Sequence, residues 1–213
     1  PGRGPATSPS AGGSPCGAAT YGGLRAPSGR GIAPTRHAAR MARGLHACRI
    51  AGFDPASLPT LSRELLDAND LHEAFIYWQV SRGAPGHGQL WRSRIPEDGI
   101  APTVFGVAVA ERPVASYDEP PCRTAVVLPD TRWLHGHVKS TSLLGNVLAS
   151  IDADAADAQD AILTRGDLVG EATASNVFLA LGDRLVTPSL DSAPILPGVT
   201  RELLLDADPT IEQ

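Results

Sequence analysis

Hydrophobic residues recur at helix or strand spacing from about residue 36 onward, and turn residues separate the stretches. In the run 37–50, Met41, Leu45 and Cys48 share one helical face, and arginines occupy the other. Runs rich in β-branched and aromatic residues indicate strands instead. Up to residue 111 the pattern predicts helices over 37–50 and 57–69, and strands over 73–81 and 102–110.

A proline-bearing, acidic stretch, 112–121, interrupts this pattern, and we predict a linker between two domains there. An apolar strand over 123–129 follows, and Ser140 or Thr141 can cap a helix whose apolar residues recur at helical spacing. Beyond it the pattern predicts a strand over 160–165, a meander over 168–187 and a helix that starts near Gly198.

Residues 1–35 lack this periodicity. They contain nine glycines and six prolines, a composition that buries too little apolar surface to offset the entropy lost on ordering. No acidic residue precedes Asp54, and every charge before it is an arginine. We therefore predict that residues 1–35 are disordered. An arginine-rich targeting peptide and a segment translated in the wrong frame are the two explanations of the pattern.

The bulk composition excludes several classes of function. The 213 residues are 42% hydrophobic and carry a net charge of −5, with no basic surplus for nucleic acid. No apolar run approaches the length of a membrane span. Three scattered cysteines fit neither a disulfide framework nor a metal site, so we expect a reducing, cytoplasmic setting. His135 and His137 lack a third ligand, and we predict no metal site.

The distribution of positive charge draws attention to Lys139. Lysine and arginine together number 18, and seventeen of these are arginines, so Lys139 is the single lysine in the chain. A guanidinium stays protonated in proteins, whereas an ε-amine can lose its proton and attack a carbonyl. A lysine kept in an arginine-only chain suggests such chemistry. An exposed lysine that survived by chance is the other interpretation.

The residues around Lys139 resemble a segment of a known family. The run Lys-Ser-Thr-Ser-Leu-Leu-Gly-Asn-Val-Leu-Ala from Lys139, preceded by Thr131-Arg132-Trp133-Leu134, is similar to the lysine segment of class IV aminotransferases. These are fold type IV pyridoxal-phosphate enzymes, and the similarity is greatest to D-amino-acid aminotransferases. The resemblance implies that Lys139 binds pyridoxal 5'-phosphate as a Schiff base and later moves the Cα proton to the cofactor.

A second signature begins at Glu171, where Glu-Ala-Thr-Ala-Ser-Asn-Val-Phe matches the family's Glu-x-x-x-Ser-Asn-Val-Phe motif. The resemblance implies that Glu171 faces the pyridine nitrogen, where a carboxylate keeps the ring protonated and able to accept electrons. It also implies that Val199 and Thr200 bind the phosphate at a helix N-terminus while Leu196 packs on the ring. Without the motifs, these residues would be a solvent-facing glutamate and an ordinary helix entry.

Other site residues are implied less directly. The run His37-Ala-Ala-Arg40 is similar to the family's His-x-x-Arg helix, whose arginine binds the phosphate, and this implies that role for Arg40. The strand Tyr-Trp-Gln-Val-Ser-Arg-Gly resembles the one that precedes the family's substrate-carboxylate loop. Arg92 and Arg94 would then bind the α-carboxylate, with Arg94 in place of a histidine. Each arginine is otherwise a plain surface residue.

The resemblance covers about residues 36–205 and implies a two-domain, mixed α/β fold. We expect a small α/β domain over 36–118 and a larger, barrel-like domain over 119–213 that carries Lys139 and Glu171. The implied enzyme is a homodimer that transfers the amino group of a D-amino acid, such as D-alanine, to a 2-oxo acid such as 2-oxoglutarate. A branched-chain aminotransferase and an aminodeoxychorismate lyase are the enzymatic alternatives, and an inactive fragment is the non-enzymatic one.

Both ends of the chain depart from the family pattern. Relatives begin with a Gly-Asp-Gly-Val-Tyr-Glu-like strand whose tyrosine lines the substrate pocket, and we expect no counterpart of it here. They also continue past the point where this sequence stops, after Asp206-Ala-Asp-Pro209. We therefore expect an incomplete C-terminal domain.

Overall fold

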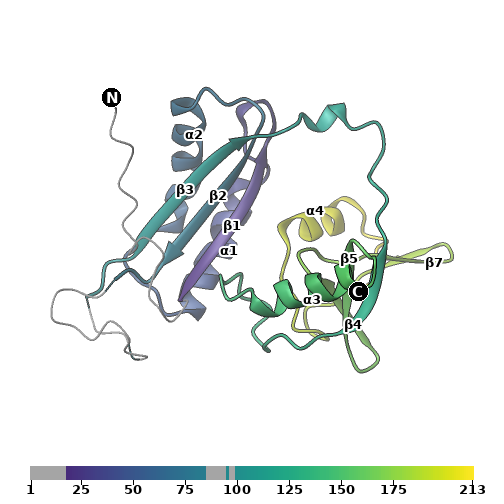
Figure 1. Cartoon of the computed structure of the whole chain (residues 1–213). Coiled ribbons are helices and arrows are strands. Elements are labelled where there is room, and N and C mark those ends of the chain that lie inside the picture. The colour runs from purple at the N-terminus through teal and green to yellow at the C-terminus, as the bar shows by residue number, and fades with distance from the viewer. Residues whose placement is uncertain (1–17, 85–94, 96–98) are drawn as a thin grey trace. The chain divides into compact units, whose positions relative to one another are not determined.

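The computed structural model describes residues 18–84, 95 and 99–213, and the chain divides into two compact units (Figure 1). Unit 1 comprises the chain through Tyr117 together with Lys139–Ser142. Unit 2 comprises Asp118–Val138 and Leu143–Gln213. Among the described residues, none of the helices combines the length and the apolar composition that crossing a membrane requires.

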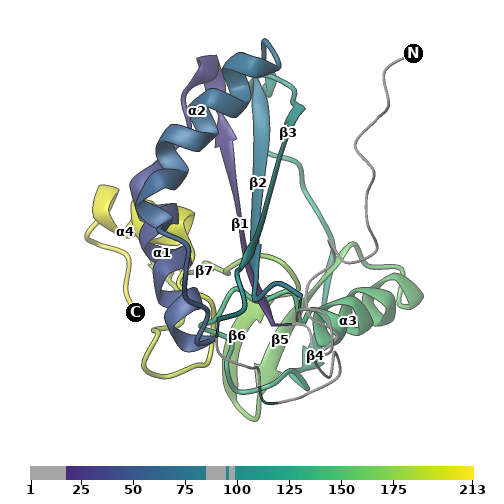
Figure 2. The same ribbon diagram turned by 90° about the vertical axis from the view of Figure 1, so that its left-hand side faces the viewer.

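Unit 1 is an antiparallel sheet with two helices on one face. Its strands are β1 (Ala19–Ala26), β2 (Ala74–Ser81) and β3 (Thr103–Ala110), in the order β1-β2-β3. The helices α1 (Pro34–Ala47) and α2 (Leu58–Ala68) cover the same face (Figure 2). Alternate residues of β2, namely Ile76, Trp78 and Val80, point into the core between sheet and helices, as the period of a strand requires.

The prediction that residues 1–35 are disordered is wrong over the described part of that segment. Residues 19–26 form β1, which pairs with β2 along its whole length, and α1 begins at Pro34. A glycine of β1 serves packing, because a Cβ on Gly23 would lie 2.3 Å from the Phe75 ring. Residues 1–17 lie outside the described residues.

Unit 2 contains a three-stranded sheet in the order β4-β5-β6, formed by β4 (Ala125–Pro129), β5 (Asp160–Arg165) and β6 (Leu168–Ala172). Strands β4 and β5 are parallel and are connected through α3 (Leu144–Ala155), whereas β6 returns antiparallel to β5. Small residues of α3, Ala149 and Ala153, pack with Leu163 in the core. A hairpin of β7 (Leu179–Leu181) and β8 (Arg184–Val186) and the helix α4 (Val199–Ala207) follow.

Two further predictions need correction. The helix α3 begins at Leu144 with Leu143 as its N-cap, so neither Ser140 nor Thr141 caps it. These two residues pair with β1 instead: the Thr141 amide donates to the carbonyl of Ala19, and Ser140 forms a bridge with Thr20. For the same reason Lys139 belongs to unit 1, not to the C-terminal domain as we predicted.

The remaining elements follow the sequence pattern closely. The predicted strands over 73–81, 102–110 and 160–165 are confirmed as β2, β3 and β5, and the helix near Gly198 is confirmed as α4. Short 3-10 helices, Pro27–Gly29, Pro55–Ser57 and Val114–Ser116, lie between the main elements. The chain thus has the mixed α/β fold in two parts that we expected.

Candidate active site

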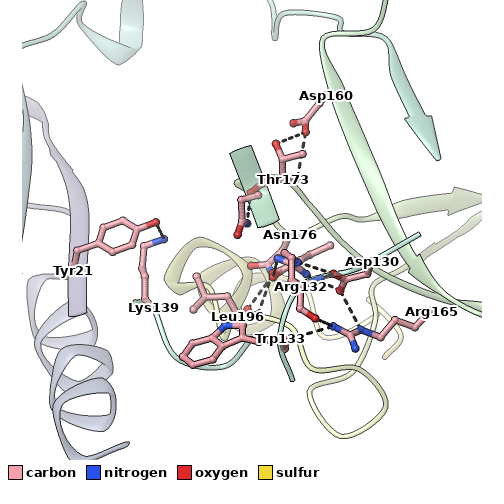
Figure 3. A network of polar contacts seen from close by, with 12 residues as sticks. Tyr21, Asp130, Arg132, Trp133, Lys139, Asp160, Arg165, Thr173, Asn176 and Leu196 are labelled. Atoms are coloured by element: carbon pink, nitrogen blue, oxygen red, sulfur yellow. Dashed lines mark hydrogen bonds and ion pairs between the residues drawn. The ribbon is translucent and has the colours of Figure 1, made fainter. Parts of the chain in front are cut away.

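Lys139 is anchored to strand β1 of unit 1. Its carbonyl accepts a hydrogen bond from the Tyr21 amide at 2.9 Å, and its side chain turns back over the same tyrosine. The Lys139 Nζ donates to Tyr21 Oη at 3.3 Å and lies 4.4 Å from the centre of the ring (Figure 3). An amine on an aromatic face gains a cation–π attraction, and the phenol oxygen fixes its direction. The backbone and side-chain contacts together hold the amine in one place.

Tyr21 contacts the Lys139 amine, and the sequence interpretation did not anticipate this contact. We expected no counterpart of the family's N-terminal tyrosine, yet β1 carries a tyrosine against the lysine amine. Tyr21 also stacks on Tyr77 of β2, with ring centroids 5.6 Å apart. The sequence held one signal for this residue, its position along the chain. Tyr21 lies in the strand that directly precedes the run starting at His37, with a short turn between them.

A buried arginine lies on α1 of the same unit. The sequence pattern placed arginines on the solvent face of this helix, yet Arg40 is only 8% exposed. Its Nη2 lies 3.3 Å from His37 Nδ1, one turn earlier. Burial, followed by the positive charges of Arg40 and Lys139, lowers the pKa of His37 to about 4. The imidazole is therefore neutral at neutral pH and can accept from the Arg40 guanidinium.

Glu171 lies on β6 in unit 2 and is 5% exposed. Arg132 Nη1 donates to its Oε1 at 2.8 Å, while Asn176 Nδ2 and the Leu196 amide each donate to its Oε2 at 3.0 Å. Three donors thus fix both carboxylate oxygens. The expectation that such a strand glutamate would face solvent does not apply here.

The Arg132 side chain is held from the other side by Asp130. Its Nε and Nη2 donate to the two oxygens of Asp130 at 2.9 and 3.0 Å, and Arg165 Nε donates to the same carboxylate at 3.1 Å (Figure 3). Burial raises the pKa of Asp130, but hydrogen bonds from Arg132 and the charges of both arginines outweigh it and hold that pKa below its usual value. Burial likewise lowers the pKa of Arg132, and its contacts with Asp130 and Glu171 raise it overall.

The segment before α4 is tied to the Glu171 cluster. Asn176 Nδ2 donates to the Leu196 carbonyl at 2.9 Å as well as to Glu171. A Cβ on Gly198 would lie 2.0 Å from Asn176 Oδ1, so this backbone approach requires glycine. Gly198 is the N-cap of α4 and has no side chain to accept from the first amides of the helix, where Val199 is buried and Thr200 exposed. A helix start of this kind suits an anion.

The predicted site residues therefore fall into two groups. Unit 1 holds Lys139 and Arg40, and burial, together with the positive charges of both, lowers the pKa of His37 in the same unit. Unit 2 brings Glu171 and Leu196 into direct hydrogen-bond contact, with Val199 and Thr200 at the following helix start. Arg92 and Arg94, the predicted carboxylate ligands, lie outside the described residues.

Comparisons with known proteins identify the family of the chain. A family model described as "Amino-transferase class IV" matches residues 19–212. A D-alanine aminotransferase from Listeria monocytogenes is 35% identical over 155 residues, which cover 72% of this chain and 52% of that protein. A D-alanine aminotransferase from Staphylococcus haemolyticus is 30% identical over 187 residues, which cover 85% and 62%. The chain thus spans roughly half the length of the first of these relatives.

Solved structures share the fold at lower identity. The Escherichia coli branched-chain amino acid aminotransferase superimposes with a TM-score of 0.76 at 20% identity, covering 92% of this chain and 68% of that one. A branched-chain aminotransferase from Thermobaculum terrenum, solved in its PLP form, gives 0.76 at 21% identity and covers 92% and 67%. A putative 4-amino-4-deoxychorismate lyase from Legionella pneumophila gives 0.76 at 20%, covering 93% and 73%.

Proposed function

This chain belongs to the class IV aminotransferase family, and on that premise we propose that it transfers the amino group of a D-amino acid to a 2-oxo acid, using pyridoxal 5'-phosphate. D-alanine is the proposed donor and 2-oxoglutarate the proposed acceptor. The observation that carries the proposal is the single lysine of the chain, whose amine is held 3.3 Å from the phenol oxygen of a tyrosine on a neighbouring strand.

The choice of D-amino acids rests on sequence. Relatives at 30–35% identity are D-alanine aminotransferases, whereas the branched-chain aminotransferases and the lyase are near 20% and support only the fold. The run that follows Lys139 and the strand that contains Tyr77 are also most similar to the D-amino-acid group. These features favour D-alanine over a branched-chain donor.

The described residues fit the proposed cofactor. Arg40 offers a buried guanidinium and the start of α4 offers amides next to a glycine, and both suit a phosphate dianion. Glu171 offers a fixed, ion-paired carboxylate that suits a protonated ring nitrogen. We propose that Arg40, Val199 and Thr200 bind the phosphate, Glu171 the ring nitrogen and Leu196 the ring face.

In this proposal the bound cofactor supplies an aldehyde for an amine and a ring that takes up electrons. The chain supplies the amine and the proton transfers. Lys139 Nζ would hold the cofactor and, once the substrate amine has replaced it there, would carry the Cα proton; Tyr21 Oη, at 3.3 Å, would orient that amine and could exchange a proton with it. Glu171 contributes a negative charge that its three donors keep in place. Arg92 and Arg94 remain the proposed partners of the substrate carboxylate.

We further propose a homodimer in a reducing, cytoplasmic compartment. The family resemblance supports the dimer, and three scattered cysteines support the compartment. Light scattering on the purified chain separates a dimer from a monomer.

The experiment that tests the function is an assay of the purified chain with pyridoxal phosphate. We expect near-visible absorbance from the bound cofactor and formation of pyruvate from D-alanine when 2-oxoglutarate is present. L-leucine and aminodeoxychorismate serve as competing substrates. Turnover of L-leucine alone would favour a branched-chain enzyme, pyruvate from aminodeoxychorismate would favour a lyase, and absorbance without turnover would support an inactive fragment.

Tyr21→Phe tests the contact on which the proposal rests. The substitution keeps the ring under the Lys139 amine and its stacking on Tyr77 but removes the oxygen. We expect kcat for D-alanine to fall by about 10²-fold, the lower end of the range for general acid–base groups, with little change in cofactor binding. Tyr77→Phe, which loses a hydrogen bond to Gln79, is the matched control. Equal kcat values for Tyr21→Phe and wild type would remove Tyr21 from the mechanism.

A further inference from the structure

The ends of the strands in unit 2 bring four charged side chains together. Asp130 directly follows β4, and Arg165 is the last residue of β5. Because β4 and β5 are parallel, their carboxyl ends meet at one edge of the sheet. The Asp130 amide donates to the Thr164 carbonyl at 2.7 Å, which fixes the aspartate against the neighbouring strand. Arg132, two residues after Asp130, connects this edge to Glu171 on β6, because its Nη1 donates to the Glu171 carboxylate.

Arg132 is held at both its backbone and its side chain. Asp130 Oδ1 accepts from the Arg132 amide at 3.0 Å, and the carboxylate also binds the guanidinium in a bidentate manner. Arg165 Nη2 donates to the Arg132 carbonyl at 2.8 Å while its Nε holds Asp130. One guanidinium nitrogen of Arg132, Nη1, remains for Glu171. The direction of that nitrogen is therefore set by Asp130 and Arg165 as well as by Glu171.

The four side chains also balance in charge, with two carboxylates against two guanidiniums. Asp130 and Glu171 are 3% and 6% exposed at the side chain, and Arg132 is 10% exposed, so water screens these charges weakly. Arg165 is more accessible, at 28%. If Asp130 lost its charge, both guanidiniums would be left with Glu171 as the remaining carboxylate of the cluster.

We propose that Asp130 and Arg165 are positioning residues for Glu171, acting through the Arg132 guanidinium. Both fix the direction of the Glu171 carboxylate, and Asp130 also offsets the positive charge of the Arg132 guanidinium that Glu171 faces. The second effect rests on the proposed function, in which Glu171 meets a protonated ring nitrogen. With a smaller opposing charge, the carboxylate holds that proton more strongly.

The test uses Asp130→Asn and Arg165→Gln in the full chain, and its first readout needs no cofactor. The Leu196 amide donates to Glu171 Oε2, so its NMR resonance reports the orientation of the carboxylate. We expect both substitutions to shift the Leu196 amide. Asp160→Asn is the matched control, because Asp160 lies in the same sheet. Its Oδ1 accepts hydrogen bonds from the amide and the hydroxyl of Thr173, and among the described residues it does not contact Arg132 or Glu171.

The second readout is the ¹⁵N chemical shift of the ring nitrogen in bound, labelled pyridoxal phosphate. We expect Asp130→Asn to move it toward the unprotonated position, and kcat to fall by roughly 10-fold to 100-fold, the range seen for partners of ligating residues. If Asp130→Asn does not fold, Arg165→Gln, whose side chain is more exposed, decides instead: it should still shift the Leu196 amide and, because it removes a positive charge, should move the ring-nitrogen chemical shift in the opposite direction.

An unmoved Leu196 amide in folded Asp130→Asn and Arg165→Gln would overturn the positioning role. A ring nitrogen that titrates as in the wild type would overturn the charge effect. If the wild-type chain binds no pyridoxal phosphate, the proposed function and the charge effect fail together, while the amide shift still decides the positioning role.

Discussion

Lys139→Ala is expected to lower kcat for D-alanine by about 10⁴-fold or more and to abolish the near-visible absorbance of the bound cofactor. The substitution removes both the nucleophile and the proton carrier. No other lysine exists in the chain to replace it, because the other seventeen of the 18 lysine and arginine residues are arginines. Stopped-flow spectra and a pyruvate assay measure the two effects.

Lys139→Arg is the informative control for this experiment. A guanidinium can keep the charge over the Tyr21 ring, but it stays protonated and cannot serve as the nucleophile. We expect this variant to be as inactive as Lys139→Ala while keeping the fold of unit 1. If Lys139→Arg retained activity, the positive charge alone would account for the role of this residue, and the covalent role would have to be abandoned.

Glu171→Gln is expected to lower kcat by about 10²-fold to 10³-fold, the range for the loss of one preorganised electrostatic contact. Glutamine has the same shape, and its carbonyl oxygen can still accept from the Leu196 amide or from Arg132. It lacks the negative charge that would hold a proton on the ring nitrogen. Steady-state kinetics with D-alanine and the spectrum of the bound cofactor measure the change.

Two comparisons make the Glu171 result interpretable. Glu171→Asp keeps the charge on a shorter arm, and we expect part of the lost kcat to return. A thermal melt of Glu171→Gln checks that the cluster with Arg132 and Asn176 has not simply unfolded. A folded Glu171→Gln variant with wild-type kcat would show that this carboxylate has no part in the reaction.

Local patterns predicted most elements because their causes lie within a few residues. Alternating β-branched and aromatic residues placed β2 within one residue of its observed start, and a glycine followed by apolar periodicity placed α4. The strand β1 was missed because its glycines look like a disordered segment. One of them, Gly23, is small because the ring of Phe75, a residue about fifty positions later, occupies the space that its Cβ would need.

The site residues themselves could be recognised from local motifs, whereas their partners could not. Glu171 and Lys139 stood out by motif, but no local pattern indicated that Arg132 would join Glu171 to Asp130. That network depends on two parallel strands ending at one edge, a pairing between residues more than thirty positions apart. Helical period alone would place Arg40 on the solvent face of its helix, yet its side chain is buried in the structure.

Residue types at short, fixed spacing were enough to indicate the family, the mixed α/β class and the candidate lysine and glutamate. Three features became visible in the folded chain alone: Tyr21 contacts the Lys139 amine, Lys139 pairs with the N-terminal strand, and a buried charge network holds Glu171. Such contacts join residues that are far apart in the chain. Strand pairing and burial, which no local pattern encodes, bring them together.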